Sequence, residues 1–328
     1  MRIQKSSMTG TSGAGGRSDR FSCSKTGEPS GGSGPASSCG TTPARHGSSG
    51  QSLAARTGAG LALNLRAAWA RAYVRIVGAN REPSWLIFDT GLPLLSLAAY
   101  VYVYRAMEAP PEFVGFVILG GAMTAYWMNV LWSMASQFYW EKMMGQLQLF
   151  MIAPMSRMAI LGGMAAGGLL ATTIRAGAAL LLGCLLFQVR FSISSTWSLL
   201  AMFVLTMAAL YGMGMMFASL FMVWGREAWH AANLLQEPVY LLSGFYFPVR
   251  GLGYWTCLVA SFLPLTLGLD GMRQLLFGEE KALGLLPVGR EILFLIVLSI
   301  LFLVGAAKAL QKMERLGKKE GRLTSRWQ

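Results

Sequence analysis

Six long apolar stretches separated by short polar segments dominate residues 85–310 of the sequence. Most of them reach the roughly 20 residues that a helix needs to cross a hydrocarbon core about 30 Å thick. The stretches are Trp85–Tyr104, Phe113–Ser136, Ile160–Phe187, Trp197–Val223, Ala231–Phe247 and Val288–Leu310. The fifth is the shortest and carries Glu237 beside Pro238, so its ends are weakly marked. The pattern predicts an all-α, polytopic membrane protein with six transmembrane helices.

The segment before the first stretch has a helical period of its own. Apolar residues recur at helical spacing over residues 61–82, with arginines among them. They are Leu61, Leu65, Trp69, Ala72 and Ile76, with Arg66, Arg71, Arg75 and Arg81. A basic amphipathic helix of this kind lies either in the headgroup layer of a membrane or on an ordinary soluble surface. The apolar stretch that follows within a few residues favours an N-terminal interfacial helix.

The two ends of the chain differ in composition from its middle. Residues 1–60 are rich in Ser and Gly with scattered Arg, and they lack the apolar run of a secretory signal peptide. Such a segment cannot bury enough apolar surface to offset its chain entropy, so we expect a disordered tail. Residues 61–310 form the transmembrane domain, and residues 311–328 form a basic cytoplasmic tail.

Composition supports the membrane class and orients the chain. Of 328 residues, 54% are apolar and 13% charged, whereas soluble domains average about 25% charged. The net charge of +13 does not indicate nucleic-acid binding, because Lys and Arg cluster in the tails and short loops, as orientation signals do. Placing residues 66–81, Lys142, Arg157, Arg226 and the basic tail in the cytoplasm gives the stronger bias. We therefore expect a multi-pass protein among membrane lipids, with both termini cytoplasmic.

The side chains of catalysis are scarce in this sequence. Its four cysteines and two histidines form no CxxC pair, no His-Cys cluster and no Ser/His/Asp constellation. A P-loop, GxxxxGK followed by Ser or Thr, is also missing, since the only Gly-Lys pair is Gly317-Lys318. We expect no catalytic residue, cofactor or metal site on this chain.

The segment 137–158, between the second and third stretches, fits neither a span nor a solvated loop. Its start is too polar to cross a membrane, and residues 147–152 are too apolar to face water. Exposed apolar side chains on a short cytoplasmic helix need a cover. The segment either packs on the spans or in the interface, or docks in a groove of a cytoplasmic partner. The residues alone leave both possibilities open.

A motif in this segment favours the second possibility. Glu141-Lys-Met-Met-Gly-Gln-Leu147 precedes Pro154-Met-Ser-Arg157 at the mouth of the third stretch. This run resembles the cytoplasmic coupling loop of type-2 ABC exporter permeases, with Gln146 and Gln148 where that family often has Thr and Glu. The resemblance implies ATPase-coupling residues at Glu141, Lys142, Gly145, Leu147, Leu149, Pro154 and Arg157.

A second match precedes the sixth stretch, in the order and spacing of the same family. Leu242–Pro248, Phe262–Thr266 and Asp270–Arg273 resemble the outer end of the family's fifth span and the re-entrant hairpin that follows. Leu263 replaces a usual Asn, and Gly253 lies near a usual Pro. Gly and Pro destabilise the interior of a helix by about 1 and 3 kcal/mol, so Gly244 and Pro248 should end the fifth helix. The apolar run 258–267 is too short to cross a membrane. The hairpin residues implied are Gly244, Pro248, Pro264, Asp270 and Arg273.

The resemblance covers about residues 137–275 and implies a function. The chain would be a permease subunit, not an enzyme, with ATP-Mg hydrolysed by a separate ABC ATPase in trans. A second permease, identical or different, would complete a dimer in a bacterial cytoplasmic membrane. The substrate would be a hydrophobic or amphipathic compound such as a drug, a lipid or a lipid-linked glycan. The alternative is a self-sufficient secondary transporter or an intramembrane enzyme, which usually needs several intramembrane carboxylates or a His, Asp or Cys cluster.

Three ionisable residues stand out within the apolar stretches, where a charge costs a few kcal/mol or more: Asp89, Arg175 and Glu237. Asp89 lies about 7 Å from the expected inner edge, within reach of water. Arg175 is deep, and it either forms a structural ion pair with Glu237, lines a substrate pathway, or does not contact Glu237. The same stretch carries Gly162–Gly168, whose GxxxG spacing favours close packing within the chain.

Overall fold

The computed structural model describes residues 53–81, 83–137, 140–141, 144–145, 156–189, 191–224, 226–278, 282 and 284–319. All of them belong to one compact unit, Gln51–Gln328. Residues 1–52 of the expected disordered tail lie outside the described residues, and so do Lys142, Leu147, Leu149 and Pro154. The predictions for these residues stay predictions.

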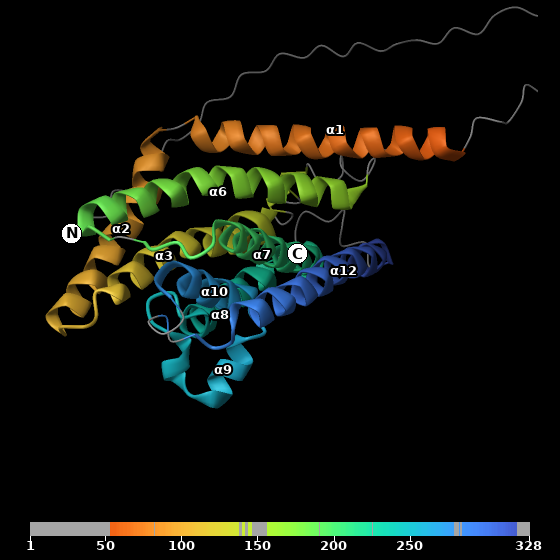
Figure 1. Ribbon diagram of the computed structural model, residues 1–328. Helices are drawn as coiled ribbons and strands as arrows, with labels where there is room; N and C mark the ends of the chain where they lie inside the picture. The colour runs from red at the N-terminus through yellow and green to blue at the C-terminus, as the bar shows by residue number, and fades with distance from the viewer. Residues whose placement is uncertain are drawn as a thin grey trace, which may run out of the picture. The chain divides into compact units, whose positions relative to one another are not determined.

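Every element in the described part of the chain is helical, and Figure 1 shows how the elements lie. In chain order they are α1 (Leu53–Asn80), α2 (Pro83–Ala106), α3 (Glu112–Met128), η1 (Asn129–Ala135), α6 (Arg157–Phe187), α7 (Thr196–Trp224), α8 (Arg226–Ser243), η2 (Val249–Leu252), α9 (Tyr254–Ala260), α10 (Pro264–Phe277) and α12 (Val288–Lys319). The prediction of an all-α fold is confirmed for these residues.

Four of the helices are long and apolar enough to cross a membrane. They are Glu112–Ala135, Arg157–Phe187, Thr196–Phe221 and Val288–Leu316, which correspond to the second, third, fourth and sixth predicted stretches. The first of these joins α3 to η1, a π-helical segment, without a break. The described residues therefore support a multi-pass membrane protein with four such helices.

The first and fifth predicted spans, α2 and α8, also form helices but are not among these four. Part of α2 lies outside the residues whose side chains the structure describes, so its crossing of a membrane stays a prediction. The fifth, α8, begins at Arg226 and ends at Ser243, four residues before the predicted end at Phe247. It stops there because Gly244 has a φ of 59°, outside the helical region and favoured by glycine. The prediction of six spans thus goes further than the described helices establish.

The core forms where α3 and η1 lie among α6, α7 and α10. The interior faces of these elements bury Phe116, Trp127, Met134 and Leu210 completely. Residues Pro264–Leu276 of α10 are all buried, and α7 packs along α12. The buried α10 is the second arm of the predicted hairpin, because α9 and α10 meet at a bend of 106° after a short break. Whether this bent pair enters the membrane from one side stays a prediction.

The N-terminal helix α1 is longer than expected and packs against α6. It begins at Leu53, not at residue 61. The Ser156 amide donates to Asn64 Oδ1 over 2.8 Å at the start of α6, and further along, Gly163 lies against Ala68 and Gly167 against Ala72. Because the contacting residue numbers rise together along α1 and α6, the two helices run in the same direction, side by side (Figure 1).

The predicted location of α1 in the headgroup layer stays a prediction. The sequence did not predict that α1 packs lengthwise against α6, a candidate span. The physical reason for this packing is the pairing of small residues, which lets the two backbones approach closely. A Cβ added to Gly163 would lie 2.3 Å from the Ala68 carbonyl oxygen. The expected packing of the glycine motif within the chain is confirmed.

A glycine pair on α6 allows this contact to be tested with a matched control. A Cβ at Gly163 meets the α1 backbone, whereas a Cβ at the adjacent Gly162 meets nothing within 4 Å. We expect Gly163→Ala to destabilise the protein by about 1–3 kcal/mol through overpacking. Gly162→Ala should be neutral or stabilise it by about 0.5–1 kcal/mol through helix propensity. Thermal unfolding in detergent micelles measures both, and equal effects of the two substitutions would contradict the α1–α6 contact.

Candidate functional site

The predicted coupling loop begins with an acid that faces inward. Glu141 is 1% exposed, forms an ion pair with Arg71 of α1, and accepts a hydrogen bond from Gln137 Nε2 over 3.3 Å. The resemblance implied that this residue takes part in coupling to an ATPase, which stays a prediction. The ion pair places the Glu141 carboxylate against α1.

Two residues near Glu141, Trp140 and Met144, have exposed apolar side chains. The side chains of Trp140 and Met144 are 47% and 67% exposed. Gly145 follows in a turn with a φ of 76°, a backbone conformation that glycine adopts without strain. The predicted importance of Gly145 therefore has a conformational basis. Sequence reasoning did not single out Trp140 or Met144, although two large apolar residues flanking a charged pair are visible in the sequence.

The other end of the loop is held by the last described helix. Ser156 caps α6 by accepting from the Ala159 amide over 3.2 Å, which leaves Arg157 as the first residue of the helix. Arg157 forms an ion pair with Glu314 of α12. This contact ties the start of the third predicted span to the C-terminal part of α12, the sixth.

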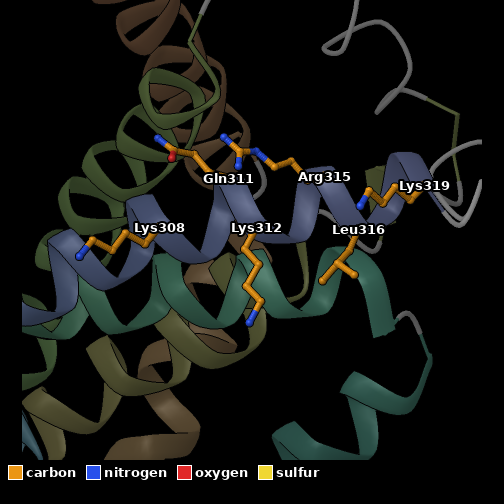
Figure 2. Close-up of a pocket in the computed structure, with 6 residues that line it drawn as sticks. All are labelled: Lys308, Gln311, Lys312, Arg315, Leu316 and Lys319. Atoms are coloured by element: carbon orange, nitrogen blue, oxygen red, sulfur yellow. The ribbon is translucent and has the colours of Figure 1, made fainter.

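The same end of α12 carries a basic face, shown in Figure 2. A shallow pocket of about 480 Å³ is lined by Lys308, Gln311, Lys312, Arg315, Leu316 and Lys319. Gln311 and Arg315 project together from one side of the helix, and Lys312 projects away from them (Figure 2). The helix continues to Lys319, so the described part of the predicted tail extends α12 and carries the charge expected on the cytoplasmic side.

Arg175 lies where two cavities meet in the middle of the helices. The first, here called the cationic cavity, has a volume of about 330 Å³ and lies between α1, η1 and α6. Its polar lining consists of Arg71, Arg75, Asn129, Ser133, Gln137 and Arg175. Arg75 donates to the Ser133 hydroxyl, and its guanidinium is charged at neutral pH, as that of arginine is in proteins.

The second space, here called the aromatic cavity, has a volume of about 570 Å³ and is lined by α2, α3, η1, α6 and α8. Phe88, Trp132, Tyr240 and Tyr246 supply its aromatic surface, and Asn129 and Arg175 belong to both cavities. Trp132 is held in place by donating from Nε1 to Gln236 of α8 over 2.8 Å. Sequence reasoning found Arg175 but missed these neighbours, which come from four segments far apart in the chain.

The other two predicted intramembrane charges lie differently. The Glu237 side chain is exposed on α8, and its carboxylate accepts from Gln236 over 3.5 Å. No ion pair in the described part of the chain joins it to Arg175, so this pairing stays a prediction. Asp89 belongs to α2, but its side chain lies outside the described residues.

At the predicted hairpin, Arg273 is buried and links α10 to the turn that follows α8. Its side chain is 1% exposed and lies over the Phe116 ring at 5.0 Å. One terminal nitrogen donates to the carbonyls of Gly244 and Phe245 over 2.8 Å each. The other donates to Phe247 over 3.3 Å. These carbonyls belong to the turn that follows α8, so Arg273 joins that turn to α10.

Of the remaining hairpin residues, Pro248 and Pro264 lie where helices begin, whereas Asp270 lies within α10. Pro248 immediately precedes η2, and Pro264 is the first residue of α10, where its missing N–H costs nothing. Asp270 is buried and accepts from the Leu285 amide over 2.6 Å and from Gln274 over 3.1 Å. The same Gln274 nitrogen donates to Glu291, which is fully buried in the first turn of α12. Glu291 was missed because it sits at the margin of an apolar run.

The ion pair between α1 and the coupling loop can be tested by a double-mutant cycle. Arg71→Gln and Glu141→Gln should each lower the free energy of unfolding by about 1–3 kcal/mol, because each leaves the other, largely buried residue without its counter-charge. The double variant should recover at least about 0.5 kcal/mol relative to the sum. Unfolding in detergent micelles measures all three, with Arg66→Gln, exposed on the same helix, as the neutral control. Additive losses would contradict a direct interaction.

A search of curated proteins finds no match to the chain. The profile described as ABC-2 type transporter matches residues 65–277, which include most of α1, the coupling region, both cavities and the hairpin. The match covers well over half of the chain. The protein therefore belongs to the ABC-2 type transporter family, as a membrane subunit of the transport machinery.

Proposed function

We propose that this chain is the permease subunit of an ATP-driven exporter of a hydrophobic or amphipathic compound. The observation that carries the proposal is the family match over residues 65–277 in a sequence without a P-loop. A transport subunit that binds no nucleotide needs an ATPase in trans, and ATP-Mg would bind there. The expectations that this chain holds no catalytic residue, cofactor or metal remain part of the proposal.

The contacts around the coupling region suggest how force from an ATPase would reach the helices. A partner pressing on Trp140 and Met144 would act on a segment that Glu141 ties to α1. The Arg157–Glu314 pair would carry displacement of the loop's far end from α6 to α12. The loop is thus attached to three long helices, and closure of the ATPases would tilt them together. Packed helices respond to such a push as rigid bodies.

The assembly would contain two permeases and two ATPases, because one chain supplies one set of spans. The second permease is either a copy of this chain or a different one. The proposed location is a bacterial cytoplasmic membrane, with six spans, both termini in the cytoplasm, lipids around the helices and no nucleic acid. A self-sufficient secondary transporter is the competing function, and transport by this chain alone in sealed vesicles would establish it.

The proposed orientation predicts which surface residues are accessible from outside the cell. In a background without the four native cysteines, Pro110→Cys should react with a membrane-impermeant maleimide in intact cells, because it lies in the turn between α2 and α3. Lys319→Cys, exposed at the end of α12, should react only after the cells are opened. Gel-shift labelling distinguishes the two states. Labelling of residue 319 but not of residue 110 in intact cells would reverse the orientation.

The coupling surface predicts the outcome of placing charges in it. Met144→Asp together with Leu147→Asp would put two carboxylates into an apolar contact, which costs several kcal/mol of association. The permease should still insert, since neither residue lies in a span. Co-purification of the ATPase and permease-stimulated ATP hydrolysis should both fall at least tenfold.

The control for this experiment is Leu258→Asp. Leu258 is 48% exposed on α9, at the proposed outer side, so the same kind of substitution there should leave ATPase binding unchanged. Retention of the ATPase and of full export by the coupling-surface variant would show that the docking site lies elsewhere. Loss of both in the control would show a general defect of insertion.

A further inference from the structure

A third cavity, here called the apolar slot, lies between α3, α6, α7 and α10. It has a volume of about 460 Å³ and shares no described lining residue with the cationic or the aromatic cavity. The described residues that line it are aliphatic or aromatic apart from Thr173 and Thr196, and none of them is charged. Small-molecule sites span about 300–1,000 Å³. The slot is therefore large enough for a ligand, and its lining favours an uncharged, apolar one.

The inner end of the slot is closed by polar groups that bond to one another. The Tyr126 hydroxyl donates to the Thr173 hydroxyl over 3.1 Å, and Thr173 donates to the Leu169 carbonyl over 2.7 Å. The Phe203 ring lies edge-on to Tyr126, with 5.7 Å between the ring centroids. Both hydroxyl protons at this end are used within the protein. A hydrocarbon, which forms no hydrogen bonds, fits here without leaving a polar group unpaired.

The slot runs from this end toward the connection between α6 and α7. Its lining covers Leu119 to Tyr126 on α3 and Thr196 to Phe203 on α7. Each of these stretches rises about 10 Å at 1.5 Å per residue, about a third of a 30 Å hydrocarbon core. Trp197, at the start of α7, is 83% exposed and is of the type that gathers at the membrane–water interface. The slot therefore lies within one leaflet, on the side of the α6–α7 connection.

The slot opens sideways between α6 and α7. Its α6 lining lies on one face of that helix, at Thr173, Ala176, Gly177 and Leu180. Gly177 is exposed, and a Cβ added to it would meet nothing within 4 Å. Leu200 of α7 also lines the slot and is 51% exposed. In a membrane this opening faces the hydrocarbon of the bilayer.

Hydrocarbon is the filling that the slot favours. Water does not occupy an apolar cavity, because it finds no polar partners there. An unfilled void forfeits the dispersion contacts of the side chains that line it. Because lipid tails are as apolar as leucine, these contacts, and not the hydrophobic effect, draw a chain into the slot.

The outer end of the slot is joined to the predicted hairpin. The Ser192 and Ser194 amides, in the α6–α7 connection, donate to the carbonyls of Leu276 and Leu275 over 3.0 Å each. Leu276 and Met272 of α10 also line the slot. An occupant would therefore contact α10 together with three long helices, and it would add to the packing of the hairpin.

We propose that the apolar slot binds one acyl chain of a phospholipid from this leaflet, with the lipid headgroup at the α6–α7 connection near Trp197. In the proposed orientation this is the outer leaflet. The inner end of the chain reaches the Tyr126–Thr173 pair. The inference holds for this chain as a membrane protein and does not depend on ATP-driven export, so its test can fail without affecting the proposed function.

Photolabelling of the unaltered protein tests the site. The protein is placed in phosphatidylcholine nanodiscs in which a small share of the lipid carries a diazirine halfway along one acyl chain, and mass spectrometry identifies the labelled residues. Leu119 and Met123 line the slot on α3 and are 7% and 2% exposed, whereas Phe116 of the same helix is fully buried and does not line it. We expect Leu119 and Met123 to be labelled at least about fivefold more than Phe116, because a close-packed interior admits no lipid chain. Equal labelling of the three residues would overturn the proposal.

The position of the diazirine tests the leaflet. Leu119 lies about one helical turn nearer the α6–α7 connection than Met123. A diazirine close to the ester should label Leu119 more than Met123, and one halfway along the chain should label Met123 more. A chain that enters from the opposite leaflet would reverse this order and contradict the proposal.

A variant of α6 with a matched control locates the chain. Gly177→Leu should lower the labelling of Met123 at least about fivefold, because the new side chain fills the slot. Labelling of Leu301, which is 60% exposed on α12, should not change. Gly162→Leu is the same substitution on the same helix, also with nothing within 4 Å of an added Cβ, and should lower neither. Unchanged labelling of Met123 in Gly177→Leu would overturn the proposal, and the comparisons on the unaltered protein decide it even where a variant fails to fold.

Discussion

The close backbone contact between α1 and α6 determines where the arginines of α1 lie and which polar side chains they reach. Gly163 and Gly167 bring α1 near enough for its arginines to reach side chains on η1 and in the coupling region. A helix set even one side-chain diameter further away would leave Arg71 and Arg75 on the surface. Glu141 would then lose its partner, and the cationic cavity would lose two of its three arginines.

The second organising contact lies at the opposite end of the helices. There Arg273 donates hydrogen bonds to carbonyl groups of the turn after α8, and Gly120 lets the α3 backbone approach so closely that a Cβ would overlap the Phe245 carbonyl oxygen. These contacts hold the turn after α8 and the buried α10 as one block. The two ends therefore differ in character: one is joined by charged pairs between side chains, the other by a cation that caps the backbone.

The features that could be predicted from the sequence are those that depend on local pattern, namely where long helices form and where one of them ends. Four apolar runs became long helices because their length and hydropathy leave few alternatives, and Gly244 ended α8 as its conformational freedom implies. The glycine motif indicated close packing but not its partner, since any small-residue face could meet it. The inward turn of Glu141 could not be predicted, because an acid near a helix end looks the same whether it faces a partner or Arg71. The cavities escaped sequence reasoning for a related reason: Arg75, Asn129 and Arg175 come together only in three dimensions.

The pair between Arg157 and Glu314 has a consequence for biosynthesis. The two residues are 157 positions apart, so at 5–20 residues per second the ribosome needs about 8–30 s to make the chain between them. During that interval the start of α6 is already in place while its counter-ion has not been made. Lipid headgroups or water must solvate the Arg157 guanidinium meanwhile, and the ends of α6 and α12 that carry this pair join only after residue 314 has been made. The surface offered to an ATPase would thus be finished late, after the helices that carry it have been inserted.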